Sequence, residues 1–62
     1  MATDTDDIPI NEADAAKLAG IAYPTLARFR REGSGPRCIR IGRLVRYMPA
    51  DVRAWRNAQR EG

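Results

Sequence analysis

The chain has one cysteine and no histidine, which limits how so small a protein can be held together. A disulfide needs two cysteines, and a Cys/His zinc site needs several such ligands. The 62 residues must therefore rely on one hydrophobic core, which at this size buries only about 60% of the unfolded chain's surface. With 44% apolar and 31% charged residues, the composition is that of a globular domain. The sequence predicts a single small domain of marginal stability.

The start of the chain, residues 1–7, is polar and acidic and is unlike a secretory signal peptide. No apolar run approaches the roughly 20 residues of a membrane-spanning helix. The unpaired thiol of Cys38 suits a reducing compartment. We therefore expect a cytoplasmic protein without a membrane partner. Residues 1–7 are expected to form a flexible acidic tail and residues 8–60 a single domain.

The two signs of charge are separated along the sequence. Residues 1–14 carry five acidic side chains and no cation, whereas residues 15–62 carry all 11 cations against three acids. Ten of the 11 cations are arginine, whose planar guanidinium favours bidentate recognition of phosphates or guanine edges. With a pI near 9.8, nucleic acid is the expected partner. A well-solvated basic surface is the alternative.

Residues 12–19 are expected to form a first helix. Asn11 is a good N-cap, and the acids in the first turn suit the positive end of the helix dipole. Gly20 is suited to end the helix. The apolar residues that recur on one helix face are Ala15, Leu18 and Ala19.

A second helix is expected over residues 24–31. Pro24 suits the first turn of a helix, and the Gly- and Pro-containing run 32–36 stops it. Leu26 and Phe29 are expected to face inwards. The outer face then holds Thr25, Ala27, Arg28 and Arg31. Two short helices joined by a Gly-containing turn form a helix-turn-helix, whose second helix can enter a major groove of DNA.

The next residues, 39–47, indicate a β-hairpin whose loop we infer from hydrophobic alternation. A two-residue turn would mix apolar and charged residues on one face. A three-residue loop, 42–44, keeps the faces separate and pairs Ile41 with Val45, Ile39 with Tyr47, and Arg40 with Arg46. Two arginines directly opposite each other destabilise a hairpin unless an anion lies between them. We expect this three-residue loop, with Arg43 at its tip.

A third helix is expected from Met48-Pro49, with Val52, Trp55 and Ala58 on its buried side. The order helix, helix, wing, helix makes the fold mainly α with a small two-stranded β-hairpin, a winged helix-turn-helix. The side chains expected in the core are Leu18, Ile21, Leu26, Phe29, Ile39, Ile41, Val45, Tyr47, Val52 and Trp55.

The sequence contains no pattern typical of a catalytic site. Without histidine, no Ser–His or Cys–His pair can form. The Gly-rich turn 33–36 lacks the length and the lysine of a phosphate-binding loop. The acids sit at helix starts or in the tail and suggest no carboxylate pair. We expect a protein that is not an enzyme and needs no cofactor, metal or small-molecule ligand.

Seven arginines lie between residues 28 and 46, against the single acid Glu32. Arg28 and Arg31, one helical turn apart, are suited to base edges or phosphates in a major groove. Arg43 at the wing tip suits the adjacent minor groove, whose negative potential attracts arginine. The residues expected to contact DNA are Tyr23, Thr25, Arg28, Arg31, Arg40, Arg43 and Arg46.

Several basic and polar residues have an alternative structural role. Thr25 could equally cap its helix, and the stem of Arg30, near the apolar side, could simply cover the core. The arginines expected to be ordinary surface charges or partner contacts are Arg53, Arg56 and Arg60.

Several segments resemble, in this order, the MerR-like winged-helix domains of phage excisionases and AlpA-type regulators. Residues 12–21 resemble the opening helix and turn of these domains. The recognition helix and its end are resembled by Thr25-Leu26 and Arg31-Glu32-Gly33. The segments that resemble the wing and closing helix are Gly35-Pro36, residues 39–43, residues 45–47 and Asp51-Val52 with Trp55. The similarity covers residues 10–57. One departure is Ala22, where the family commonly has a serine cap; the loss could cost about 1 kcal/mol, which Pro24 is expected to offset.

The resemblance implies sequence-specific binding to double-stranded DNA through the second helix and the wing. Small members of the family are recombination directionality factors, which bind repeated sites cooperatively, bend DNA and direct an integrase towards excision. It therefore implies a phage or mobile element in a bacterial host, an integrase partner and head-to-tail self-association along DNA. A small winged-helix transcriptional regulator is the first alternative. A protein-binding module whose basic surface docks an acidic partner is the second.

Overall fold

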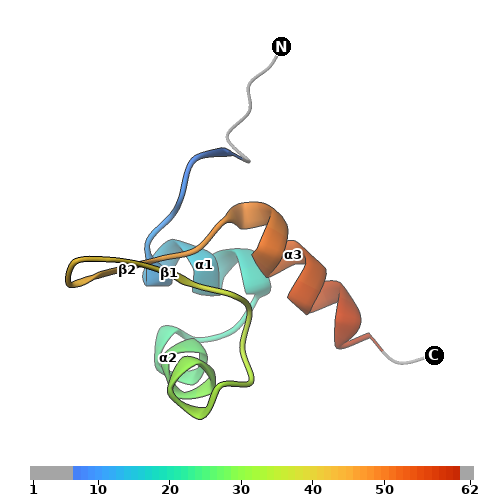
Figure 1. The fold of residues 1–62 in the computed structure, drawn as a ribbon. Coiled ribbons are helices and arrows are strands. Elements are labelled where there is room, and N and C mark those ends of the chain that lie inside the picture. Colours follow the sequence, from blue (N-terminus) through green and yellow to red (C-terminus); the bar gives the residue numbers. More distant parts are fainter. Residues whose placement is uncertain (1–6, 61–62) are drawn as a thin grey trace.

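Three helices and one hairpin form the fold of the computed structural model, which describes residues 7–60 (Figure 1). In chain order the elements are α1 (Glu12–Ala19), α2 (Tyr23–Glu32), β1 (Ile39–Ile41), β2 (Leu44–Arg46) and α3 (Pro49–Ala58). Helix α1 packs against both α2 and α3, and the hairpin extends away from α3 (Figure 1). The predicted winged helix-turn-helix is confirmed. Of the predicted acidic tail, residues 1–6 lie outside the described residues.

Helix α1 has the bounds and both end signals that the sequence predicts. The Asn11 side-chain oxygen accepts a hydrogen bond from the Asp14 backbone N–H at 2.8 Å. At the other end Gly20 has a φ of 79° and donates its N–H to the carbonyls of Ala16 and Lys17. This left-handed conformation favours glycine. Both ends of α1 are therefore set by local interactions, the side-chain cap at Asn11 and the left-handed turn at Gly20.

Helix α2 is one residue longer at each end than predicted. Its N-cap, Ala22, provides no side-chain hydrogen bond, and Gly33 ends the helix with a φ of 76°. Leu26 is fully buried, as expected, but Ala27 is only 8% exposed, so its predicted position on the outer face is wrong. Because the Arg30 side chain is hydrogen-bonded to Glu12 of α1, the side of α2 that faces the core includes both Ala27 and Arg30.

The predicted three-residue loop of the wing is wrong. The hairpin pairs Ile39 with Arg46, Arg40 with Val45 and Ile41 with Leu44, which leaves a two-residue turn, Gly42-Arg43. Gly42 has a φ of 60°, and Arg43 has no positive φ, the pattern of a type II′ turn. Ile39, Ile41 and Leu44 are 37%, 52% and 49% exposed. Since no wing face is well buried, burial does not select the register, and the glycine turn does.

The core lies where α1 meets the other helices and the base of the wing. Its buried apolar side chains are Ala15, Ala16, Ala19, Leu26, Ala27, Tyr47 and Val52. Ile10, Leu18, Ile21, Cys38, Val45 and Trp55 pack against this cluster and are partly buried. The small side chains of α1 allow the neighbouring helices to approach closely.

Two predicted core residues and one predicted helix contact are wrong. Ile39 and Ile41 are exposed because they lie on the projecting wing. Ala58 is exposed because the last turn of α3 extends beyond the core. Phe29, on α2, packs against α3 through an edge-to-face contact with Trp55, with ring centroids 5.5 Å apart. The helices, rather than the wing, therefore supply most of the buried surface.

Residues that precede α1 and follow β2 join the wing to the helices. Ile10 and Tyr47 exchange both backbone hydrogen bonds, each 2.8 Å long. Tyr47 was expected to pair with Ile39, and this pairing replaces it. No helix within residues 7–60 is long and apolar enough to cross a membrane.

Candidate nucleic-acid interface

The exposed side of α2 carries two of the predicted contact arginines. Arg28 and Arg31 are both exposed. The Arg28 guanidinium lies 5.2 Å from the centroid of the Phe29 ring and 3.9 Å from the Glu32 carboxylate. Exposed ion pairs of this kind contribute about 0–1 kcal/mol. The Arg28 guanidinium therefore gives up little by turning to an anion outside the protein.

The first turn of α2 carries the two other predicted contacts on this helix. Tyr23 is 53% exposed, and Thr25 is half-buried. No side-chain hydrogen bond caps this end of the helix, so the alternative in which Thr25 caps α2 is wrong. Both side chains lie at the end of α2 that follows α1 in the chain.

The wing carries three predicted contact arginines on different surfaces. Arg43 is exposed in the turn at the wing tip. Arg40 is paired with Val45, and Arg46 with Ile39, so the two arginines point to opposite faces of the hairpin. The predicted pair of facing arginines around an anion is therefore wrong. The Arg46 guanidinium instead donates a hydrogen bond of 2.9 Å to the Val45 carbonyl.

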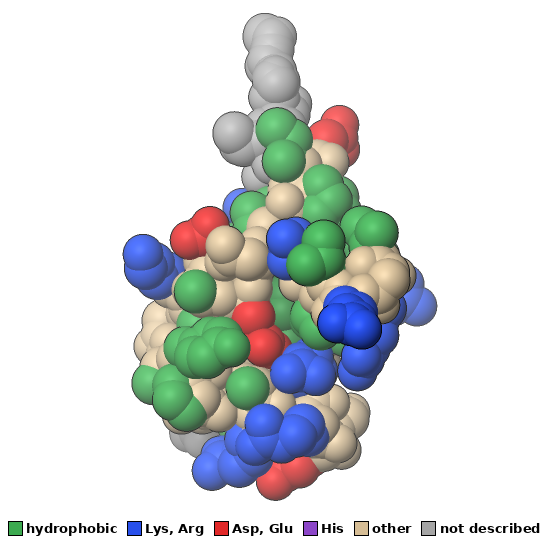
Figure 2. Space-filling model, turned by 90° about the vertical axis from the view of Figure 1, so that its left-hand side faces the viewer, with side chains coloured by type: hydrophobic (Ala, Val, Ile, Leu, Met, Phe, Trp, Pro, Cys, Tyr) green, Lys and Arg blue, Asp and Glu red, His purple; other side chains and the backbone are tan. Residues whose placement is uncertain are grey.

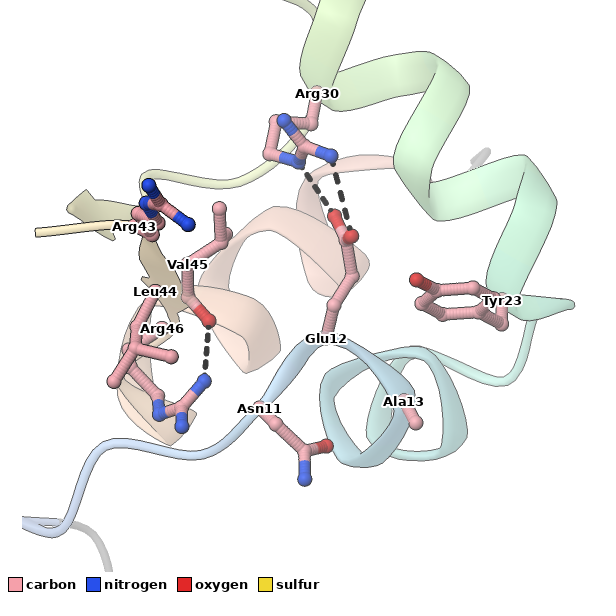
Figure 3. A pocket seen from close by; sticks show the side chains of 9 residues that line it. All are labelled: Asn11, Glu12, Ala13, Tyr23, Arg30, Arg43, Leu44, Val45 and Arg46. Carbon is pink, nitrogen blue, oxygen red and sulfur yellow. Dashed lines mark hydrogen bonds and ion pairs between the residues drawn. The ribbon is translucent and has the colours of Figure 1, made fainter. Parts of the chain in front are cut away.

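A groove of about 440 Å³ separates the wing from α2 (Figure 3). Its walls come from β2 and the wing tip on one side and from α2 on the other, with the start of α1 between them. The lining residues are Asn11, Glu12, Ala13, Tyr23, Arg30, Arg43, Leu44, Val45 and Arg46. The groove brings together three predicted contacts, Tyr23, Arg43 and Arg46. The other four, which do not line it, are Thr25, Arg28, Arg31 and Arg40.

A buried carboxylate lies at the centre of this groove (Figure 3). Glu12, the first residue of α1, is 8% exposed. Its Oε2 accepts hydrogen bonds from Arg30 Nε at 2.7 Å and Tyr47 Oη at 2.8 Å. Its Oε1 accepts a third, from Arg30 Nη2, at 3.3 Å. One carboxylate thus joins α1, α2 and the segment that follows the wing.

The pKa shifts of these groups keep the network in one protonation state near neutral pH. Burial raises the pKa of Glu12, but the hydrogen bonds from Arg30 and Tyr47 and the nearby arginine charges outweigh it and leave this pKa below its ordinary value. The hydrogen bond to Glu12 raises the pKa of Arg30. Burial, and then the Glu12 carboxylate, raise the pKa of Tyr47. Glu12 is therefore ionised while Tyr47 remains a donor.

Sequence reasoning missed the role of Glu12 and left that of Arg30 open. From the sequence alone, Glu12 is one of the acids in the first turn of a helix. Its partners lie 18 and 35 residues away, so no local pattern connects them. The structural alternative for Arg30 is confirmed in part, because its side chain is only 20% exposed and holds an ion pair.

Positive charge gathers around the groove. Figure 2, which faces the wing side of the molecule, shows Lys and Arg side chains mainly on the lower and right-hand parts of this surface. Over residues 7–60, no group of three or more Cys, Asp or Glu side chains is arranged to hold a metal ion. The arginines that line the groove, Arg30, Arg43 and Arg46, suit this surface to the binding of an anion with several negative charges.

A helix-turn-helix followed by a basic hairpin defines the class of winged helix-turn-helix domains, in which the second helix and the wing face DNA. The family model described as a helix-turn-helix domain matches residues 11–60, and the chain belongs to this family. The family includes excisionase-like and AlpA-like small DNA-binding proteins. Membership indicates that the protein binds double-stranded DNA. No curated protein matches the chain significantly.

Proposed function

We propose that the protein is a sequence-specific, DNA-bending excisionase that directs the integrase of a phage or mobile element towards excision. The observation that carries this proposal is the distribution of exposed arginines over two elements on either side of one groove. Arg28 and Arg31 lie on α2, and Arg43 lies at the wing tip. Two basic elements so arranged suit a protein that binds adjacent grooves of one duplex and neutralises phosphates along one side of it.

In this proposal α2 enters the major groove, where Arg28 and Arg31 meet base edges and phosphates. Arg43 enters the adjacent minor groove. Tyr23 and Arg46, on opposite walls of the groove between wing and α2, contact the phosphate backbone that passes between them. Thr25 contacts a phosphate or a thymine methyl group, and Arg40 a flanking phosphate. No step is catalytic, and the protein acts on DNA in the cytoplasm of a bacterial host.

Cooperativity follows from the small size of the reading surface. One helix and one wing contact few base pairs, so a single site is expected to bind with modest affinity and specificity. Repeated sites with head-to-tail contacts between bound copies raise the effective concentration of each copy for the next site. An array of copies would bend the DNA and present it to the integrase.

A gel-shift titration with phased-bend analysis tests this function. The DNA is the region that flanks the protein's own gene, including any attachment site. Stepwise, cooperative complexes on bent DNA would support an excisionase and lead to an excision assay with the neighbouring integrase. One unbent complex at a promoter would indicate a transcriptional regulator instead. No shift even at low salt would indicate that the arginine surface binds a protein.

A further inference from the structure

The wing is joined to the rest of the domain at few points. Its apolar strand residues Ile39, Ile41 and Leu44 are exposed and are not part of the core cluster. Val45 packs against the core but is only partly buried. The remaining attachments lie at the two ends of the hairpin: Cys38, before β1, packs against the core, and the backbone of Tyr47, after β2, pairs with Ile10. Packing alone therefore restricts the orientation of the wing only weakly.

The side chain of Tyr47 supplies a directional restraint. Tyr47 is fully buried, and its hydroxyl donates to Glu12 over 2.8 Å. The same carboxylate receives two hydrogen bonds from Arg30 of α2. Because the guanidinium is planar and binds through two nitrogens, it fixes direction as well as distance. The wing and α2 are thus oriented against one shared carboxylate.

We propose that Glu12 is a positioning residue for DNA binding, which sets the orientation of the wing relative to α2. The inference rests on the proposed function and deepens it. In this proposal one DNA duplex is contacted by both α2 and the wing. Contact by one element strengthens binding by the other only when the orientation of the two elements is fixed before DNA binds. Glu12 is hydrogen-bonded to Arg30 of α2 and to Tyr47, the residue that follows β2. The DNA contact itself is left to arginines such as Arg43.

A role in stability alone is a poorer explanation for this network. Replacing a buried ion pair by apolar residues is often neutral or stabilising, so a fold that needed only stability at this position could use an apolar side chain. The attested use of such pairs is to select one arrangement among several. Here the arrangement selected is that of two elements with little direct contact between them.

Residual dipolar couplings of the free protein provide a test that does not depend on DNA. In the wild-type protein, the N–H vectors of α2 and of the hairpin are expected to fit one alignment tensor. In Tyr47→Phe, which removes only the hydroxyl, the hairpin couplings are expected to shrink or to need a second tensor. Couplings that still fit one tensor with the wild-type orientation would overturn the inference. Arg30→Lys, which keeps the charge but loses the two-nitrogen contact, enters the same measurement in case Tyr47→Phe does not fold.

A double-mutant cycle on DNA separates positioning from stability. Tyr47→Phe is expected to weaken binding about fivefold, the order of one hydrogen bond. In the Arg43→Ala background the same change is expected to weaken binding less than about twofold, because the wing contact is already lost. In the Arg60→Ala background, which leaves the contacts of both α2 and the wing intact, the full effect is expected. An equal effect in all three backgrounds would contradict positioning and indicate a structural role.

Failure of the two proposals can be told apart. If the wild-type protein binds no DNA, the proposed function fails, and the dipolar couplings still decide whether Glu12 orients the wing. If DNA binds and Arg43→Ala weakens it while Tyr47→Phe changes neither couplings nor affinity, the function stands and the positioning role of Glu12 is wrong.

Discussion

Glu12→Gln should destabilise the domain far more than its place in the first turn of a helix suggests. The substitution removes the counter-charge of Arg30, whose side chain is only 20% exposed. The amide oxygen of glutamine can accept the two hydrogen bonds that Oε2 receives from Arg30 Nε and Tyr47 Oη. The amide NH2 group only donates, so it faces the Arg30 Nη2 donor and the third hydrogen bond is lost. An arginine is then left half-buried with an incomplete set of acceptors.

The magnitude follows from the burial of this pair. Breaking a fully buried pair by removing one partner costs about 3–5 kcal/mol. Because Arg30 keeps some contact with solvent, we expect a loss of about 2–3 kcal/mol. A domain of this size has a free energy of unfolding of only about 3–9 kcal/mol. The melting temperature should therefore fall by roughly 10–20 °C.

Thermal and urea unfolding followed by far-UV circular dichroism measure this change. Asp14→Asn is the matched control, since it removes the same charge from the first turn of the same helix at an exposed position. Loss of its favourable interaction with the helix dipole should cost about 0.3–1 kcal/mol. If Glu12→Gln were no more destabilising than Asp14→Asn, the reasoning about the Glu12 network would be refuted.

Three further predictions concern pH, capping and salt. The pKa of Glu12 is lower in the folded protein than its ordinary value of 4.5. The stabilisation that ionised Glu12 provides is therefore complete above pH 4.5 and is lost as the pH falls through the folded pKa. Measured against pH, the free energy of unfolding should show this loss in the wild-type protein and a flatter profile in Glu12→Gln. Ala22→Ser should stabilise the domain by about 1 kcal/mol, because the N-cap of α2 lacks a side-chain hydrogen bond and a serine hydroxyl there can accept one from the Thr25 N–H. An unchanged midpoint of denaturant unfolding would contradict this prediction. With about five phosphate contacts, the slope of log affinity against log salt concentration should be about −4.5, and Arg43→Ala should reduce its magnitude by about 0.9. Arg60 lies beyond the end of α3, so Arg60→Ala should leave the slope unchanged. Equal slopes for the two variants would show that Arg43 is not in the interface.

Much of the fold could be predicted because its signals are local. The cap at Asn11 and the glycines at positions 20 and 33 delimit the helices within one turn of each. Charge patterning identified an arginine-rich surface on α2 and the wing, and family membership supports DNA binding. The seven residues assigned to DNA contact stay a prediction. They lie on α2, on the two wing strands and in the turn between these strands.

The errors of sequence reasoning in the wing share one physical origin. Hydrophobic alternation was used to choose the register of the hairpin, but Ile39 and Ile41 are exposed, so alternation carries little information there. The glycine turn at Gly42 was the better local signal. A wing that projects from the core obeys turn geometry more than burial.

Local signals in the sequence predict the bounds of the first two helices to within one residue, the start of the third helix, and a hairpin before it. They also show that the later part of the chain is rich in arginine. These properties depend on neighbours within a few residues, so they can be inferred from the order of the amino acids. The burial of Glu12, and the inward positions of Ala27 and Arg30 on α2, depend instead on how the helices pack. Glu12 meets Arg30 and Tyr47 across 18 and 35 residues. Contacts at such separations form only when helices pack and the strand after the wing returns to α1.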